Sequence, residues 1–157
     1  RYVDPRTDKV NYGVDLSVLI VPAKSTKDIP YEIPNVVWGD SSKSGVGDQV
    51  IICGYPYGTE MFKFTESNRG IIQPTFYQGI VSAIMPATKL YETRIIQVSI
   101  PSAGGMSGGA MFDPETGEVM GMITSCVHKN GIPQPMSYAI PSEIIAPYVE
   151  VITFKTN

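Results

Sequence analysis

The sequence predicts an all-β domain, an antiparallel β-barrel or sandwich, and three observations lead to this prediction. The 157 residues include 15 glycines and 13 prolines, which break the chain into short pieces and argue against long helices. The segments between these breaks are rich in β-branched residues and follow one another at close spacing. Hydrophobic residues make up 43% of the chain and charged residues 17%, which fits one globular domain that can bury a core without disulfides or metals.

The expected strands are short and lie between glycine, proline and polar turns. In chain order they cover residues 14–21, 36–38, 49–54, 76–84, 94–100, 110–112, 118–124 and 137–140. The first of these strands has apolar residues at both odd and even positions, so we expect it to be buried largely on both faces. Residues 1–13 are polar and irregular, and residues 127–135 are expected to form a loop.

A helix is expected near the C-terminal end of the chain. Ser142 can cap its N-terminus, and Glu143 lies in the first turn, where an acidic side chain interacts favourably with the helix dipole. Apolar residues recur on one side of the segment as far as Ile152. Pro147 has no backbone N–H, so we expect the helix to break or restart there.

Charge and cysteine content argue against several function classes. The net charge is −3 and no basic cluster occurs, so binding of nucleic acid or of an anionic membrane surface has little support. No apolar run approaches the length that spans a bilayer. The two cysteines, Cys53 and Cys126, match no zinc pattern and lie in apolar stretches. We therefore expect two buried free thiols, no metal and no cofactor, and the cysteines leave the compartment unknown.

Glycines surround one serine in the stretch Gly105-Met106-Ser107-Gly108-Gly109. Such a serine can expose its hydroxyl on a tight turn, with neighbouring N–H groups free to point at a substrate oxygen. The same residues also fit an ordinary turn between two strands. They formally fit the nucleophile elbow of α/β-hydrolases, which requires a helix directly after the serine. Two glycines and an Asp-Pro turn follow instead, so the elbow is disfavoured.

Seven segments resemble, in order, motifs of the HtrA-type (Deg) serine proteases of the chymotrypsin fold. They are residues 14–19 (VDLSVL), 47–58 (GDQV, then GYPYG), 79–83 (GIVSA), 96–97 (IQ), 107–110 (SGGA), 117–121 (GEVMG) and 139–142 (AIPS). Together they span about residues 14–145. Because all seven occur in the family's order, the resemblance favours the protease fold over an isolated turn.

The resemblance implies a chymotrypsin-like antiparallel Greek-key β-barrel with a short C-terminal helix, the N-terminal barrel of the family being largely missing. Residues 1–21 would hold the last strand or strands of that N-terminal barrel, with the triad aspartate. Residues 22–35 would be the inter-barrel connector. Residues 36–157 would form the C-terminal barrel, with the nucleophilic serine and the terminal helix.

The same resemblance implies a trypsin-like serine endopeptidase that cleaves peptides or proteins through an acyl-enzyme. Ser107 would be the nucleophile, and the N–H groups of Gly105 and Ser107 would form the oxyanion hole. Asp15 would orient a catalytic histidine and stabilise its cation. The residues implied to line the substrate pocket are Pro101, Thr124, Ser125, Cys126 and Met136. No acid lies near Pro101 and Met136 would shorten the pocket, so we expect cleavage after small or medium apolar residues.

The sequence departs from the family in its histidine. The triad histidine should lie a few tens of residues before Asp15, yet only 14 residues precede it and none is histidine. His128, the single histidine of the chain, follows the serine and is expected to be an exposed loop residue. The chain begins at Arg1 rather than Met, as a processed or truncated product would. Because Asp15 and Ser107 are both present, we expect the catalytic histidine in a part of the parent protein outside these 157 residues.

Two functions from different classes therefore remain open. The first is the serine endopeptidase, with its histidine supplied from elsewhere in the parent protein. The second is a catalytically inactive domain of the same fold that binds peptides or has a structural role. The resemblance also implies a homo-oligomer or association with the missing part of the N-terminal barrel, and an extracytoplasmic location by family analogy only.

Overall fold

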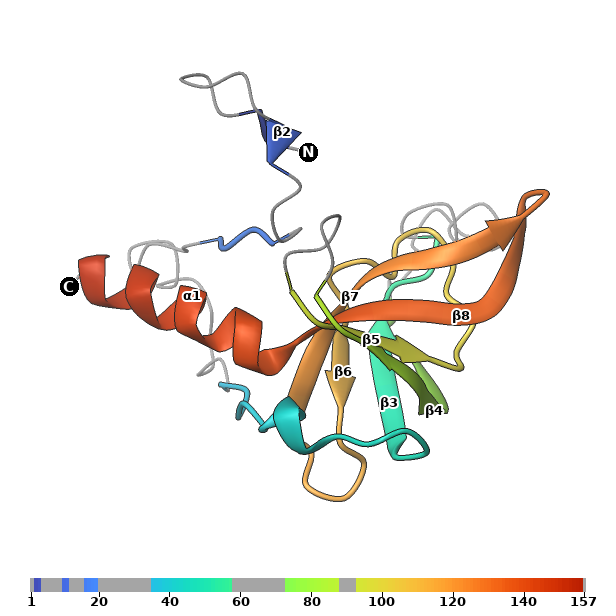
Figure 1. Ribbon diagram of the computed structural model, residues 1–157, viewed down its shortest axis with the longest axis horizontal. Helices are drawn as coiled ribbons and strands as arrows, with labels where there is room; N and C mark the ends of the chain where they lie inside the picture. The colour runs from blue at the N-terminus through green and yellow to red at the C-terminus, as the bar shows by residue number, and fades with distance from the viewer. Residues whose placement is uncertain are drawn as a thin grey trace.

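The barrel predicted from the sequence is present in the computed structural model, which describes residues 2–3, 10–11, 16–19, 35–57, 73–87 and 93–156. Its strands are β3 (Gln49–Gly54), β4 (Thr75–Met85), β5 (Ile95–Val98), β6 (Ala110–Phe112), β7 (Val119–Lys129) and β8 (Ile132–Pro141). All neighbours are antiparallel, and the strands close in the order β3-β4-β5-β8-β7-β6 (Figure 1). Because β6 returns to pair with β3, the order β6-β3-β4-β5 is a Greek key.

Side-chain alternation along the strands produces the core. In β3, Val50 and Ile52 are buried and point inward, while Ile51 and Cys53 are half-buried on the outer face. Inward-facing residues from all six strands form one apolar cluster, which also includes Met106 from the loop before β6. Its buried members are Val50, Ile52, Val81, Ile96, Val98, Ile100, Met106, Met111, Ile123 and Ala139.

Helix α1 (Ser142–Thr156) lies against one end of the barrel, on the side opposite the tip of the β7–β8 hairpin (Figure 1). A second apolar cluster joins helix and barrel through Ile145, Ile95 and Ile140. The expectation of a broken helix was wrong, because α1 continues through Pro147. Proline removes one intrahelical hydrogen bond, and packing of the helix on the barrel end compensates for that loss.

A polar network fixes the start of α1. The carboxylate of Glu143 accepts hydrogen bonds from Arg94 Nε and Nη2, both at 3.0 Å, and from the hydroxyl of Ser41 at 2.5 Å. The Ser142 hydroxyl donates to the carbonyl oxygen of Gly39 at 2.6 Å. Ser41 belongs to a short 3-10 helix, η2 (Ser41–Lys43), so the network links the segment before β3 to the helix. The expected position of Glu143 in the first turn of the helix is confirmed.

The loop expected over residues 127–135 was wrong, because these residues form the outer part of the β7–β8 hairpin. The pairs His128↔Pro133 and Lys129↔Ile132 flank a two-residue turn. Both turn residues have positive φ, 53° at Asn130 and 76° at Gly131, as in the type I′ turns that favour Asn-Gly. The Asn-Gly pair was the sequence signal for this hairpin, and the neighbouring prolines obscured it.

The N-terminal part differs from expectation in two places. Residues 1–13 contain two short paired strands, β1 (Tyr2–Val3) and β2 (Val10–Asn11). The described part of the strand expected at 14–21, residues 16–19, has no strand structure, and Leu19 is 88% exposed rather than buried. A strand needs a hydrogen-bonded partner, and no described segment pairs with these residues. Asp15 lies outside the described residues.

The strand expected at residues 36–38 is reduced to one parallel bridge between Trp38 and Val119. Val36 and Val37 are exposed, and the bridge is held by hydrogen bonds from Val119 N to Val37 O and from Gly39 N to Val119 O. The expected division of the chain into residues 1–21, 22–35 and 36–157 stays a prediction, since most of residues 1–35 lies outside the described ranges. Within the described ranges, no helix has the length and apolar character needed to cross a bilayer.

Candidate active site

Ser107 lies in the loop between β5 and β6, and the preceding residue, Met106, anchors this loop in the core. Met106 is completely buried in the main core cluster, whereas Ser107 is exposed. A buried methionine fills core space through many small dispersion contacts. The loop therefore has one residue fixed in the barrel interior and the next residue presented at the surface.

A tight turn orients the peptide that precedes Met106. The N–H of Met106 donates to Ala103 O at 3.2 Å, and Gly105 has a φ of 94°, the left-handed value that a type II turn requires at its third residue. The N–H of Tyr57 donates to Gly104 O at 2.6 Å. In a trans peptide the C=O and the next N–H point in opposite directions. The N–H of Gly105 is therefore held pointing away from Tyr57.

Three backbone hydrogen bonds fix the loop after the serine. Gly108 N donates to Ile123 O at 2.7 Å, Ile123 N to Gly109 O at 2.8 Å, and Gly109 N to Met106 O at 2.9 Å. A Cβ atom at Gly109 would overlap the carbonyl oxygens of Cys53 and Met106. Glycine is therefore required at this position, because the backbones of β3 and the loop approach one another too closely for a side chain.

The Ser107 hydroxyl donates to Thr124 O on β7 at 3.0 Å. Among the described residues, the N–H groups of Gly105 and Ser107 donate no hydrogen bond to a backbone or side-chain acceptor. Both residues line a pocket of about 340 Å³ beside the loop. Two N–H groups of this kind next to an exposed hydroxyl can stabilise an oxyanion formed on a carbonyl that the hydroxyl attacks.

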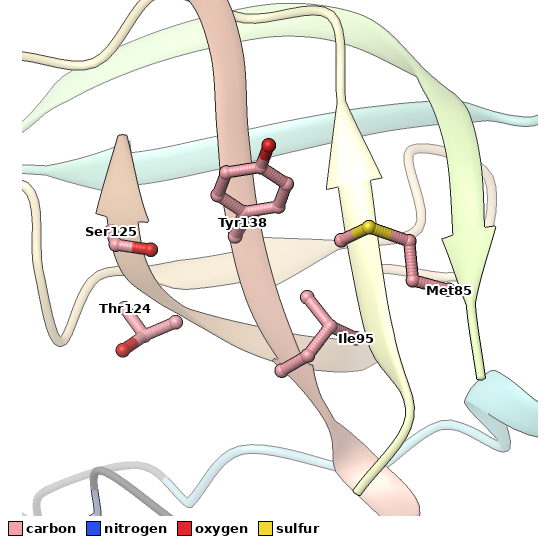
Figure 2. A pocket seen from close by; sticks show the side chains of 5 residues that line it. All are labelled: Met85, Ile95, Thr124, Ser125 and Tyr138. Carbon is pink, nitrogen blue, oxygen red and sulfur yellow. The ribbon is translucent and has the colours of Figure 1, made fainter. Parts of the chain in front are cut away.

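A second pocket, of about 170 Å³, is lined by Thr124 and by four other described residues. Figure 2 shows its lining side chains, which come from β4, β5, β7 and β8 and surround the same space: Met85, Ile95, Thr124, Ser125 and Tyr138. Met85, Tyr138 and Ile95 also belong to the second apolar cluster, against which Leu16 packs. The segment directly after Asp15 therefore lies against the same apolar cluster that lines this pocket.

Comparison with known proteins decides the family. A family model described as the trypsin-like peptidase domain matches residues 2–122. The chain belongs to this family. The trypsin-like domain is 27% identical over 142 residues to the serine protease Do-like HtrB of Bacillus subtilis, a match that covers 87% of the chain and 27% of that relative. A probable periplasmic DegP-like serine endoprotease of Brucella suis is 31% identical over 154 residues, covering 97% of the chain and 25% of the relative.

Solved structures agree on the subfamily. The HtrA-type protease AlgW with a tripeptide superposes with a TM-score of 0.61 at 26% identity, covering 76% of this chain and 36% of that chain. Its AlgWS227A form with a tripeptide gives the same TM-score at 25% identity, with the same coverage of both chains. The trypsin-like domain is therefore of HtrA type and has the chymotrypsin-like fold. It spans about a quarter of the length of the curated relatives that it matches.

Within the trypsin-like domain, the structure brings together some of the residues implied to bind substrate. Thr124 and Ser125 line the second pocket, and Cys126 follows them on β7, opposite Ser137 of β8. Pro101 is exposed, and Met136 is half-buried on β8. Pro101, Cys126 and Met136 are not among the described residues that line either pocket. A single substrate pocket formed by all five residues stays a prediction.

His128 lies on strand β7 and is exposed, so its exposure was predicted correctly and its loop position was not. It is four residues beyond Thr124, about 13 Å along a strand, and Thr124 O is the acceptor for the serine hydroxyl. Its Nδ1 instead lies 3.5 Å from Cys126 Sγ. Within the described part of the domain, His128 is therefore not placed to act as the base for Ser107.

Both cysteines are free thiols but half-buried rather than buried. Desolvation by burial raises the pKa of the Cys53 thiol above its ordinary value, so this thiol is neutral near pH 7. In the described ranges of the chain, no group of three or more histidine, cysteine or acidic side chains could hold a metal ion.

Sequence reasoning missed three features of the site. Tyr57 has a φ of 59°, which is unusual for a residue other than glycine, and the Pro-Tyr-Gly turn was its only signal. The burial of Met106 in the core was not predicted, although an apolar residue inside a glycine turn can mark a core anchor. Tyr55 and Phe112 line the pocket beside Ser107, and nothing local in the sequence relates them to one another.

Proposed function

We propose that the domain is the part of a serine endopeptidase that carries Ser107 as the nucleophile. The observation that carries this proposal is the exposed Ser107 hydroxyl at the edge of a pocket, beside the N–H groups of Gly105 and Ser107, which donate to no acceptor in the described part of the chain. The hydroxyl oxygen would attack the carbonyl carbon of the scissile peptide bond. The two N–H groups would then stabilise the negative oxygen of the tetrahedral intermediate, and collapse of that intermediate would give the acyl-enzyme and release the amine.

The general base of the proposed reaction is a histidine outside residues 1–157. Asp15 orients that imidazole and stabilises its cation. Two contacts support this arrangement: Leu16 packs against the apolar cluster that contains Met85 and Tyr138, and these two residues line a pocket together with Thr124. Since the Ser107 hydroxyl donates to Thr124 O, an imidazole entering near this pocket would lie close to Ser107. The hydroxyl then rotates from Thr124 O to the imidazole nitrogen.

Fluorophosphonate labelling of the parent protein tests the nucleophile. A fluorophosphonate phosphonylates an activated serine, so we expect one adduct, located by mass spectrometry on the peptide that contains Ser107. Ser99 provides an internal comparison, because it is an exposed serine on the same barrel and should remain unmodified. The alternative, an inactive peptide-binding or structural domain, predicts no adduct at Ser107 under conditions that label other serine proteases.

The proposed acyl-side pocket selects small or medium apolar residues before the scissile bond. Thr124, Ser125 and Cys126 would form one wall, with Pro101 at the edge, and Met136 would limit the depth. The described residues that line the second pocket carry no charge. This supports a preference for apolar substrate side chains, since a buried charge without a partner is costly. Cleavage of a peptide library should peak at alanine, valine or leucine, and a peak at arginine or phenylalanine would overturn this assignment.

A further inference from the structure

A thiol and an imidazole lie side by side on β7, beyond the part of the strand that holds the Ser107 hydroxyl. Cys126 and His128 are two residues apart, so their side chains leave the same face of the strand. The Cys126 sulfur lies 3.5 Å from His128 Nδ1 and 4.0 Å from its Nε2. In a neutral imidazole one of these nitrogens carries no hydrogen, so an acceptor for the thiol proton is within reach in either tautomer. The pair therefore places a base against a nucleophile.

The two cysteines of the chain differ in their surroundings. His128 is the only histidine of the sequence, and its ring lies against Cys126. Burial raises the pKa of the Cys53 thiol, which keeps that thiol in its less reactive, protonated form. Cys126 is half-buried and His128 is exposed, so a small reagent in solvent can reach the pair. The chain therefore contains one thiol with an imidazole beside it and one without.

Strand pairing relates Cys126 to the loop that carries Ser107. Cys126 pairs with Ser137 of β8, and directly opposed residues of an antiparallel pair have their side chains on the same face. The Ser137 hydroxyl lies 2.6 Å from Ile100 O and 2.9 Å from the hydroxyl of Ser102. Ile100 and Ser102 lead from β5 into the Ser107 loop. Cys126 therefore lies on the face of the β7–β8 hairpin that contacts the start of this loop.

We propose that Cys126 is a site of reversible oxidation by a hydroperoxide, with His128 as the acceptor of the thiol proton. Transfer of this proton to the imidazole gives the thiolate, which is the nucleophilic form. The sulfur attacks the terminal peroxide oxygen, so an S–O bond forms while the O–O bond breaks. The leaving oxygen takes the proton from the imidazolium and departs as water or an alcohol. Sulfur is oxidised to a sulfenic acid, the peroxide is reduced, and a thiol reductant restores the starting thiol.

The position of this thiol gives its oxidation a consequence for activity. Under the proposed function, on which this consequence alone rests, Cys126 belongs to the wall that contacts the acyl part of the substrate. A sulfenic acid adds a polar oxygen to that wall, and a polar group that loses water without gaining a partner is costly. Oxidation should therefore lower kcat/KM for an apolar substrate by about ten-fold or more. Reduction should restore it, so the thiol is a redox-sensitive control of substrate binding.

Trapping of sulfenic acid in the parent protein measures the two thiols in one experiment. The protein is treated with hydrogen peroxide near neutral pH in the presence of dimedone, and mass spectrometry follows the adducts on the peptides that contain Cys53 and Cys126. An unassisted thiol is only a few per cent thiolate near neutral pH, so proton transfer to His128 raises the rate, although a less basic thiolate is also less nucleophilic. Cys126 should be trapped at least about five-fold faster than Cys53, and equal rates would overturn the proposal.

His128→Gln and Lys129→Gln are a matched pair of variants, because both residues are exposed and both replacements remove a titratable group. Lys129 follows His128 on β7, so its side chain leaves the opposite face of the strand from the Cys126–His128 pair. Tyr138, the titratable residue of β8, pairs with Ser125 and lines the second pocket with it. Of the titratable groups on these two strands, His128 is therefore the one that faces the Cys126 sulfur.

The two variants should differ in the rate at which Cys126 is trapped. Near neutral pH, His128→Gln should slow trapping by at least about five-fold, and Lys129→Gln should leave it unchanged. At alkaline pH, where an ordinary thiol ionises without help, both variants should react at the rate of the unmodified protein. Equal slowing in both variants would show a general effect of charge and overturn the role of His128. Slowing in His128→Gln that persists at alkaline pH would show a structural change and would overturn it too.

The outcomes separate the oxidation site from the proposed function. If Ser107 is labelled by fluorophosphonate but Cys126 is trapped no faster than Cys53, the oxidation site fails and the function stands. If Cys126 is trapped faster and Ser107 is not labelled, the function fails and the oxidation site stands. If both react but kcat/KM is insensitive to hydrogen peroxide, the oxidation site stands and its control of substrate binding is overturned.

Discussion

Replacing Ser107 with alanine is expected to lower kcat of the parent protein by about 10⁶-fold, the loss found when a serine nucleophile is removed from a complete triad. KM should change little, since the pockets and the two N–H groups of the proposed oxyanion hole remain. Because Ser107 is exposed and its hydrogen bond to Thr124 is at the surface, the free energy of unfolding should change by no more than about 0.5 kcal/mol. Steady-state kinetics on a fluorogenic peptide, together with urea unfolding, measure both quantities.

Ser99→Ala is the matched control for this substitution. Ser99 is also an exposed serine of the barrel, and its hydroxyl oxygen accepts a hydrogen bond from Ile80 N. It lines neither of the two pockets as described. The control should retain kcat within a factor of about two to three. Activity of Ser107→Ala within ten-fold of the unmodified protein would mean that another group is the nucleophile.

Replacing Met106 with alanine is expected to affect both stability and the site. Met106 is fully buried, so the truncation leaves a cavity in the core and should lower the free energy of unfolding by about 2–5 kcal/mol. Met106 also fixes the position of the loop between Gly105 and Ser107. A displacement of about 1 Å at a reacting group can lower the rate about 100-fold, so fluorophosphonate labelling of Ser107 should slow even in the folded fraction.

Two variants separate these effects. Met111→Ala removes the same side chain from another fully buried position of the same cluster, so it should cost similar stability while slowing the labelling of Ser107 much less. Met106→Leu keeps the volume and should cost less than about 1.5 kcal/mol. Urea unfolding gives the stability of each variant, and the labelling rate is compared at a urea concentration where all are folded. Equal labelling rates in Met106→Ala and Met111→Ala would contradict the prediction that Met106 anchors the Ser107 loop.

The sequence predicts the strands of the barrel well where alternation and turn residues agree. Residues 49–54 and 110–112 match β3 and β6 without change, because each strand is bounded by turn residues and alternates between core and surface. The outer part of the β7–β8 hairpin was missed, because Pro133 and Pro135 argue locally against a strand. The Asn130-Gly131 turn outweighs them by fixing the register of the hairpin.

The site is only partly predictable because most of its geometry is non-local. The glycine pattern around Ser107 identifies an exposed serine, and the family resemblance gives it a role. The orientation of the Gly105 N–H depends on the backbone of Tyr57, and the pocket depends on the pairing of β3 with β6. Such contacts are set by the register of strands distant in sequence, so no pattern within the glycine stretch reveals them. Asp15 and its histidine partner stay predictions.

The Greek-key pairing of β3 with β6 has a consequence for the order of events during folding. Of the strand pairs in the barrel, it joins residues that are farthest apart in the sequence, and such contacts carry the largest loop-closure cost. The Ser107 loop precedes β6 directly and presses Gly109 against the backbone of β3. A chain that has not closed its barrel therefore has not yet assembled the proposed oxyanion site, so folding of the barrel must precede any activity at Ser107.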